Sequence, residues 1–228
     1  MTDSDLIGIG LYTPGEAGAL IGVRPSRLVR WLKGHQRQGK HYRRLWAPQV
    51  DLGDEHVYLG FHDLMEARVA SAFIGAGLSA QKVRRAIEVA REILGEERPL
   101  STNQFRTDGR SVFLQMSADD GDRLINLFKK QYEFKAIVEP SLRNVEFDAA
   151  GLPMRWWPLG KAGSIVIDPS RSFGRPIEST SSVPASVLAA AADAEGSLAA
   201  AARAWAVTPS AVRSALRFRD GFDMRKAA

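Results

Sequence analysis

The sequence contains no cysteine among its 228 residues. A disulfide framework, a cysteine-ligated zinc site, an iron–sulfur cluster and a thiol nucleophile are therefore excluded. With 45% hydrophobic and 25% charged residues, the composition is ordinary for a globular protein, which also excludes global disorder. At about 100–200 residues per domain, the length indicates one large domain or two to three small ones.

The motifs of common enzyme and cofactor sites are also missing. None of the four histidines belongs to an HExxH motif or to a pair spaced by four residues, so no metal site is predicted. The chain has no complete dinucleotide fingerprint, no P-loop and no Gly-x-Ser-x-Gly nucleophile elbow. We therefore expect no catalytic residues, no cofactor and no enzyme activity.

Long hydrophobic runs are absent as well. No stretch comes near the roughly 20 apolar residues that span a bilayer. The first ten residues, MTDSDLIGIG, contain two aspartates where a secretory signal peptide needs basic residues. We predict a cytoplasmic protein with no membrane partner.

Acidic residues are missing from residues 17–50. These 34 residues hold eight basic side chains, whereas the other 194 residues carry 23 basic and 26 acidic side chains, a sum of −3. A local, one-sided basic block is the electrostatic footprint of a polyanionic partner. A solvated basic face without any partner is the alternative interpretation.

Two short helices joined by a tight turn are predicted within this basic block. Thr13-Pro14 is a helix start, because a hydroxyl cap precedes proline at the first helical position. Pro25 starts a second helix that reaches Gly34, and the turn between the helices contains a glycine, as in a helix-turn-helix. The shared core is predicted to contain Ala17, Leu20, Val23, Leu28, Trp31 and Leu32.

Further elements are predicted after the helix pair. Two apolar triplets, residues 45–47 and 57–59, are expected to pair as the strands of a wing. Helices are expected at residues 61–74 and from a Ser79 cap to Leu94, where Gly95 ends the second one.

The middle region, residues 96–162, is predicted to be rich in β-hairpins. Asp108-Gly109, a favoured type I′ turn, lies between residues 104–107 and 110–114. A helix is expected at 119–130, and a second hairpin is expected to pair 145–147 with 154–157. Trp156 and Trp157 would then face opposite sides of one strand.

The tail, residues 163–228, is predicted to be mainly helical. A short strand at 165–167 and a polar connecting loop at 168–182 precede helices at 184–194, 197–204 and 209–219. The last two helices form a second helix-turn-helix pattern. The predicted fold class is therefore mainly α with small β-hairpins, α+β.

The basic helix is expected to enter the major groove of DNA, where the N-terminal residues of a recognition helix reach base edges. Arginine can make a bidentate contact with guanine or bind a phosphate, and a serine at the helix start can donate a hydrogen bond to a phosphate. Arginines beside the wing would grip the flanking backbone or the minor groove. The predicted DNA-binding residues are Thr13, Arg24, Ser26, Arg27, Arg30, Lys33, Arg43 and Arg44.

Residues 11–95 resemble the DNA-binding head of MerR-like regulators, in which a wing and a helix pair follow the helix-turn-helix. The resemblance rests on YTPGEA at 12–17, GV at 22–23, LVRWL at 28–32, FHDLMEA at 61–67, and GLS at 77–79 with VRRA at 83–86. It implies a MerR-like winged helix-turn-helix. The dimerising coiled coil and effector site that MerR relatives usually add are not evident.

Residues 163–219 are similar to a small helix-turn-helix domain of VapB-type antitoxins. This similarity rests on IVIDP at 165–169, FGRP at 173–176, VP at 183–184, VL at 187–188 and VRSAL at 212–216. The family's Gly-Thr-Arg step is replaced by Ser-Thr-Ser at 179–181, so no role is transferred to that arginine. The order of head and tail resembles the longer mycobacterial-type VapB antitoxins.

This resemblance implies the antitoxin of a type II toxin–antitoxin module, which binds and neutralises a PIN-like ribonuclease toxin. It also implies a homodimer that binds double-stranded DNA at its own promoter and represses the operon. Which domain binds the toxin does not follow from the residues. Two alternatives stay open: a MerR-like, effector-responsive regulator without a toxin partner, and a scaffold that binds only proteins.

Overall fold

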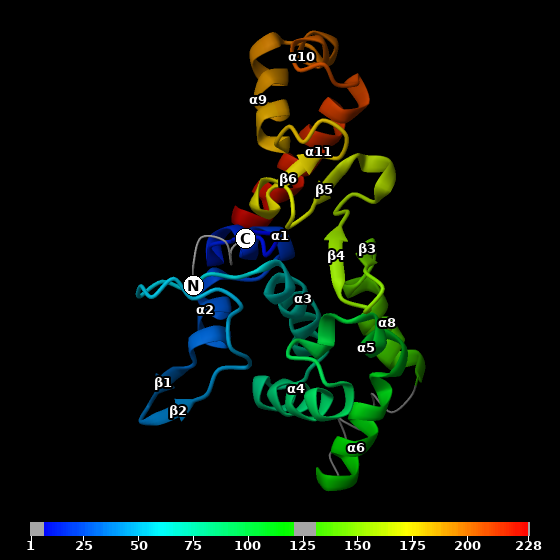
Figure 1. The fold of residues 1–228 in the computed structure, drawn as a ribbon. Helices are drawn as coiled ribbons and strands as arrows, with labels where there is room; N and C mark the ends of the chain where they lie inside the picture. Colours follow the sequence, from blue (N-terminus) through cyan, green and yellow to red (C-terminus); the bar gives the residue numbers. More distant parts are fainter. Residues whose placement is uncertain (1–6, 121–130, 228) are drawn as a thin grey trace.

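The computed structural model describes residues 7–120 and 131–227. The predicted class is confirmed, because the described chain is mainly helical with two small antiparallel sheets. Figure 1 shows an elongated molecule, with the head and the middle region at one end and the helices of the tail at the other. None of the described helices has the length and hydropathy of a segment that crosses a membrane.

The predicted helix-turn-helix is formed by α1 (Pro14–Ile21) and α2 (Pro25–Lys33). A capping box begins α1: the Thr13 hydroxyl accepts from the Glu16 N–H at 3.2 Å, and the Glu16 carboxylate accepts from the Thr13 N–H at 2.9 Å. Gly22 ends α1 in the left-handed region, with φ 71°. All six predicted core residues of this unit are buried.

The predicted wing strands are wrong. The hairpin after α2 is formed by the polar segments β1 (His35–Arg37) and β2 (Lys40–Tyr42), which pair antiparallel; we call this hairpin the wing. The apolar triplets are drawn into the core instead. Leu45 and Trp46 are buried, and the Leu45 N–H donates to the Trp31 carbonyl at 2.6 Å. Leu59 pairs with Tyr12 in an isolated bridge.

The helix pair predicted after the wing is confirmed as α3 (Phe61–Gly75) and α4 (Ala80–Leu94). Ser79 caps α4, because its hydroxyl accepts from the Lys82 N–H, and Gly95 ends this helix with φ 72°. The two helices form the centre of a continuous core that reaches from the helix-turn-helix into the middle region.

The hairpin predicted at 104–114 is wrong, because these residues form two short helices, α5 (Asn103–Asp108) and α6 (Arg110–Asp120). The Thr102 hydroxyl caps α5 by accepting from the Phe105 N–H at 3.0 Å. Gly109 has a right-handed φ of −58°, unlike the turn residue of a type I′ hairpin. The helix predicted at 119–130 overlaps the end of α6, and its residues 121–130 lie outside the described ranges.

An aromatic cluster accounts for the helical conformation of the middle region. Phe105 and Phe113 pack with Phe73 of α3 and with Phe134 of α8 (Gln131–Ser141), and their ring centroids lie 5.1–6.3 Å apart. All four rings are fully buried. Phe105 and Phe113 reach this cluster from α5 and α6, so tertiary packing favours the helical conformation here over the local hairpin signal.

A four-stranded antiparallel sheet connects the middle region to the tail. Its strands are β3 (Val145–Phe147), β4 (Pro153–Trp156), β5 (Ile165–Ile167) and β6 (Pro176–Glu178), in that order. The β3–β4 hairpin and β5 are as predicted. The connecting loop predicted at 168–182 is wrong in part, because β6 lies within it and pairs with β5. Trp156 is buried, whereas Trp157 is half-buried.

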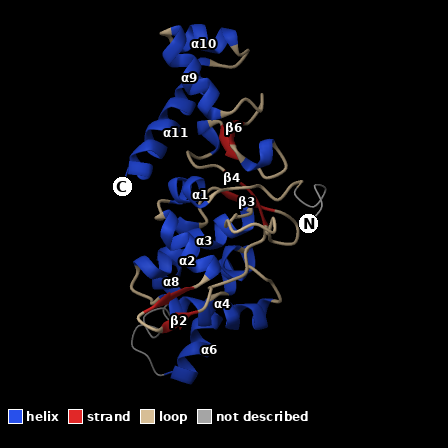
Figure 2. Ribbon diagram, turned by 90° about the vertical axis from the view of Figure 1, so that its left-hand side faces the viewer, coloured by secondary structure: helices blue, strands red, loops and turns tan. Residues whose placement is uncertain are grey.

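The tail helices are α9 (Ala185–Glu195), α10 (Leu198–Ala204) and α11 (Pro209–Ala227). Ala201, Ala202 and Val212 form a small core in which alanine permits close approach of the helices. The last helix extends well beyond the predicted residue 219. It packs against α1 of the head, and both ribbon views show it running from the tail towards the head (Figures 1 and 2).

Candidate nucleic-acid interface

Helix α2 presents one apolar and one basic face. Leu28, Trp31 and Leu32 are buried against the head. At 3.6 residues per turn, the opposite face of the helix points outward. It carries basic and small polar side chains, whereas Val29 is half-buried at the edge of the apolar face. Five of the predicted contact residues are therefore exposed along α2 and its first turn: Arg24, Ser26, Arg27, Arg30 and Lys33.

Among the residues that the structure describes, no acidic side chain neutralises the arginines of this face. Within the described part of the chain, no carboxylate lies within 4 Å of Arg24, Arg27 or Arg30. Arg30 bends back so that its Nε donates to the Ser26 carbonyl at 3.2 Å, which leaves its charge in place. The helix thus combines the shape of a groove-binding element with positive potential.

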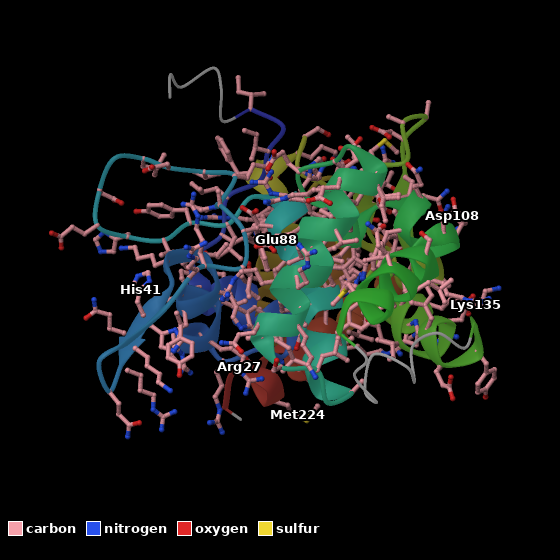
Figure 3. All side chains as sticks on the ribbon, turned by 90° about the horizontal axis from the view of Figure 1, so that it is seen from below. Arg27, His41, Glu88, Asp108, Lys135 and Met224 are labelled. Atoms are coloured by element: carbon pink, nitrogen blue, oxygen red, sulfur yellow. The ribbon has the colours of Figure 1, made fainter. Side chains whose placement is uncertain are left out.

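The wing adds basic side chains that were absent from the predicted site. Arg37 and Lys40 pair across its tip, next to the turn formed by Gln38 (φ 50°) and Gly39 (φ 73°). Both are exposed, as is His41 (Figure 3). The rings of His35 and Tyr42 stack at 4.7 Å and hold the base of the wing together. The Gln-Gly dipeptide within a basic segment was the available sequence signal for this hairpin.

Arg43 and Arg44 leave the wing in a fixed position, and both side chains are exposed. Arg84 of α4 binds the backbone beneath them: its Nε donates to the Arg44 carbonyl at 2.9 Å, and its Nη2 donates to the Arg43 carbonyl at 2.5 Å. Arg84 thereby fixes the backbone position of Arg43 and Arg44, although it lies 40 residues further along the chain. Nothing in the local sequence pattern around Arg84 predicted that role.

Two predicted contact residues are already engaged within the head. The Thr13 hydroxyl donates to the Glu16 carboxylate at 2.8 Å in addition to accepting from the Glu16 N–H. The Lys33 ammonium donates to the Glu55 carbonyl, which joins the end of α2 to the loop at residues 51–56. Thr13 is therefore used chiefly as a helix cap, and Lys33 keeps two further N–H donors. Their contacts with DNA stay predictions.

A buried carboxylate supports the segment that follows the wing. Asp63 of α3 is fully buried and accepts from the Trp46 Nε1 at 3.0 Å, the Gln49 N–H at 2.6 Å and the Gly60 N–H at 3.0 Å. The Arg98 Nε donates to the same carboxylate at 2.6 Å. These four donors satisfy the charge of Asp63 in the interior. They fix the loop between the wing and α3 to the core.

A second buried carboxylate ties α3 to the segment after α4. Glu66 accepts from the backbone N–H groups of Leu100 and Ser101, at 3.3 and 3.0 Å. Burial raises the pKa of Glu66 to about 7, although both hydrogen bonds and the charge of Arg98 oppose the rise. Its role is internal, since no part of the side chain reaches the surface. In the described ranges, no group of three histidine or acidic side chains could hold a metal ion.

Comparison with known proteins gives similarities that extend along nearly the whole chain. No family model matches the chain. Over 224 residues, it is 27% identical to the protein named "Putative antitoxin VapB45" of Mycobacterium tuberculosis (strain ATCC 25618 / H37Rv). The chain is similar to a VapB-type antitoxin. This similarity covers 91% of the chain and 93% of VapB45, so it is not confined to one of the three parts.

A solved structure has the same overall arrangement. The X-ray crystal structure of Rv2018 from Mycobacterium tuberculosis matches with a TM-score of 0.73 and 26% sequence identity, over 92% of this chain and 99% of that chain. The similarity to VapB45 and the similarity to Rv2018 thus both extend from the head through the tail.

Proposed function

We propose that this protein is the antitoxin of a type II toxin–antitoxin module and that it represses its own operon by binding the promoter. The similarity to VapB45 along nearly the whole chain supports the antitoxin role. The observation that carries the DNA-binding role is the outward face of α2 and the wing, whose arginines have no acidic partner among the described residues. No enzyme activity is part of the proposal.

In the proposed complex, α2 lies in the major groove with Arg24, Ser26 and Arg27 nearest the base edges, because they occupy the N-terminal end of the helix. Arg43, Arg44 and the wing tip contact the flanking phosphates. The protein binds as a homodimer, so its two half-sites are spaced by about one helical turn of DNA or a multiple of it.

The toxin partner is a PIN-like ribonuclease, which the antitoxin silences by direct binding. Co-expression of the chain with the reading frame next to its gene tests this step. We expect the neighbour alone to arrest growth, the pair to grow normally, and the two proteins to purify as one complex. A neighbour that is neither toxic nor bound would refute the antitoxin role.

Titration of the gene's own promoter fragment tests the DNA-binding role separately. Phosphate contacts make affinity fall with salt, by about 0.9 in the slope of log Kobs against log salt for each contact. We expect tighter binding to the promoter than to a scrambled duplex, together with such a slope. Failure to bind any duplex near 100 mM salt would contradict this role and leave the toxin-binding role standing.

A further inference from the structure

A cavity of about 690 Å³ lies at the junction of head and tail. Its walls come from α1, α9 and α11 and from the segments that precede α1 and α9. Its apolar lining includes Leu11, Leu20, Val187, Ala190, Phe218 and Phe222. The last two rings stack with their centroids 6.1 Å apart. Sites for small molecules have this range of volumes, about 300–1,000 Å³, and this apolar character.

Most polar groups around the cavity are already paired within the protein. Glu16 is held in the capping box with Thr13, and Asp193 pairs with Arg219. The Tyr12 hydroxyl donates to the Gly174 carbonyl at 2.8 Å, and burial raises the pKa of Tyr12, so this proton is retained. These bonds hold the surrounding elements in place, and they leave few polar atoms free to bind a ligand.

Two donors remain on one wall. The side chains of Arg175 and Ser186 line the cavity, are exposed, and have no partner among the described residues. The pairing of Ile177 with Pro184 brings the residues before β6 next to the first turn of α9. Asp223, on α11, also lines the cavity. An arginine beside a hydroxyl can bind a carboxylate, because the guanidinium group donates two parallel hydrogen bonds to the carboxylate oxygens.

We propose that this cavity binds an amphipathic carboxylic acid, a fatty acid in chemical class. The hydrocarbon chain lies against Phe218, Phe222 and Leu20, and the carboxylate accepts from Arg175 and Ser186. Apolar atoms removed from water contribute the larger part of the affinity. The charged hydrogen bonds fix the orientation of the ligand.

The cavity touches the helix that directly precedes the basic helix. Because α1 lines it and packs against α2, a ligand that favours one placement of α1 shifts the placement of α2. By linkage, the ligand and DNA must then change each other's affinity by the same factor. This coupling rests on the proposed DNA-binding function, whereas ligand binding itself does not.

Calorimetric titration of decanoate into the full chain tests the site. We expect saturable binding at one site per chain. Ala190→Trp should abolish binding, because Ala190 lines the cavity on α9. Ala194→Trp, on the same helix but outside the lining, is the matched control and should bind normally. Arg175→Ala should weaken binding at least tenfold, and Arg175→Lys should restore part of the loss.

Circular dichroism melting of each variant establishes that it is folded before titration. The absence of saturable heat with the native chain at millimolar decanoate would overturn the proposal, and so would equal binding by the Ala190→Trp and Ala194→Trp variants. If Ala190→Trp breaks the complex with the toxin while the native chain binds no decanoate, the cavity is part of a protein interface and the proposal is also overturned. Saturable binding that fails to alter promoter affinity would support the site and refute only the coupling.

Discussion

Replacing Arg27 with alanine should weaken DNA binding while leaving the fold unchanged. The Arg27 side chain is exposed on the first turn of α2 and makes no ion pair within the described chain. Its backbone N–H donates to the Arg24 carbonyl at 2.9 Å, and alanine preserves that bond. Substitutions at such surface positions usually change stability by less than about 0.5 kcal/mol. A loss of affinity would therefore report a lost contact with DNA.

The size and pattern of the loss identify that contact. If Arg27 reads a base, the promoter complex should weaken by about 1–3 kcal/mol, roughly 5- to 150-fold, and discrimination against other sequences should fall. If Arg27 holds a phosphate, all duplexes should weaken by a similar factor. The slope of log Kobs against log salt would then decrease by about 0.9.

Fluorescence anisotropy between about 50 and 200 mM salt, on the promoter fragment and a scrambled duplex, separates the two outcomes. Arg143→Ala is the matched control, because Arg143 is also exposed but lies outside the basic block. The reasoning is refuted if Arg27→Ala matches the native protein and the Arg143→Ala control in both affinity and salt slope. In that case, α2 does not face DNA.

Three further predictions test the supports of the interface. Arg84→Ala should lower promoter affinity several-fold in the same anisotropy assay, because the Arg43 and Arg44 carbonyls lose their anchor; unchanged affinity would show that this anchor is dispensable. Asp63→Ala should destabilise the fold by about 3–5 kcal/mol in urea unfolding, since it leaves Arg98 without its buried partner. The exposed Asp51, replaced in the same way, should cost less than about 1 kcal/mol. The raised pKa of Glu66 means that the folded state binds more protons than the unfolded state between about pH 4.5 and 7. Stability should therefore fall as pH rises through this window, by on the order of 3 kcal/mol, and Glu66→Gln should flatten that dependence in unfolding curves at several pH values.

Local signals predicted the helical parts of the head and tail. Thr13-Pro14, Ser79 and Gly95 are caps whose effects lie within one helical turn, so the sequence alone contains the cause. The exposed basic face of α2 followed for the same reason. Once Leu28, Trp31 and Leu32 face the core, Arg24, Arg27 and Arg30 are left facing solvent.

Long-range contacts determine the parts that the sequence did not predict. Residues 104–114 form helices because Phe105 and Phe113 join a cluster with Phe73 and Phe134, although Asp108-Gly109 by itself favours a hairpin. The wing consists of polar residues without hydrophobic alternation. The sequence pattern therefore favoured the apolar triplets beside it as strands. The anchoring role of Arg84 depends on a contact across 40 residues.

Hydrogen bonds at the joint between head and tail would connect a toxin bound to the tail with the basic helix of the proposed function. The Leu11 N–H donates to the Phe173 carbonyl at 3.1 Å, next to the bond between Tyr12 and Gly174. Gly174 has φ 76°, and a Cβ there would collide with the Tyr12 hydroxyl, so only glycine permits this approach. A toxin bound to the tail could therefore change the position of the segment that leads directly into α1. If the toxin binds one placement of the head more tightly than another, DNA affinity must change by the same factor. Repression would then follow the amount of toxin without any contact between toxin and DNA.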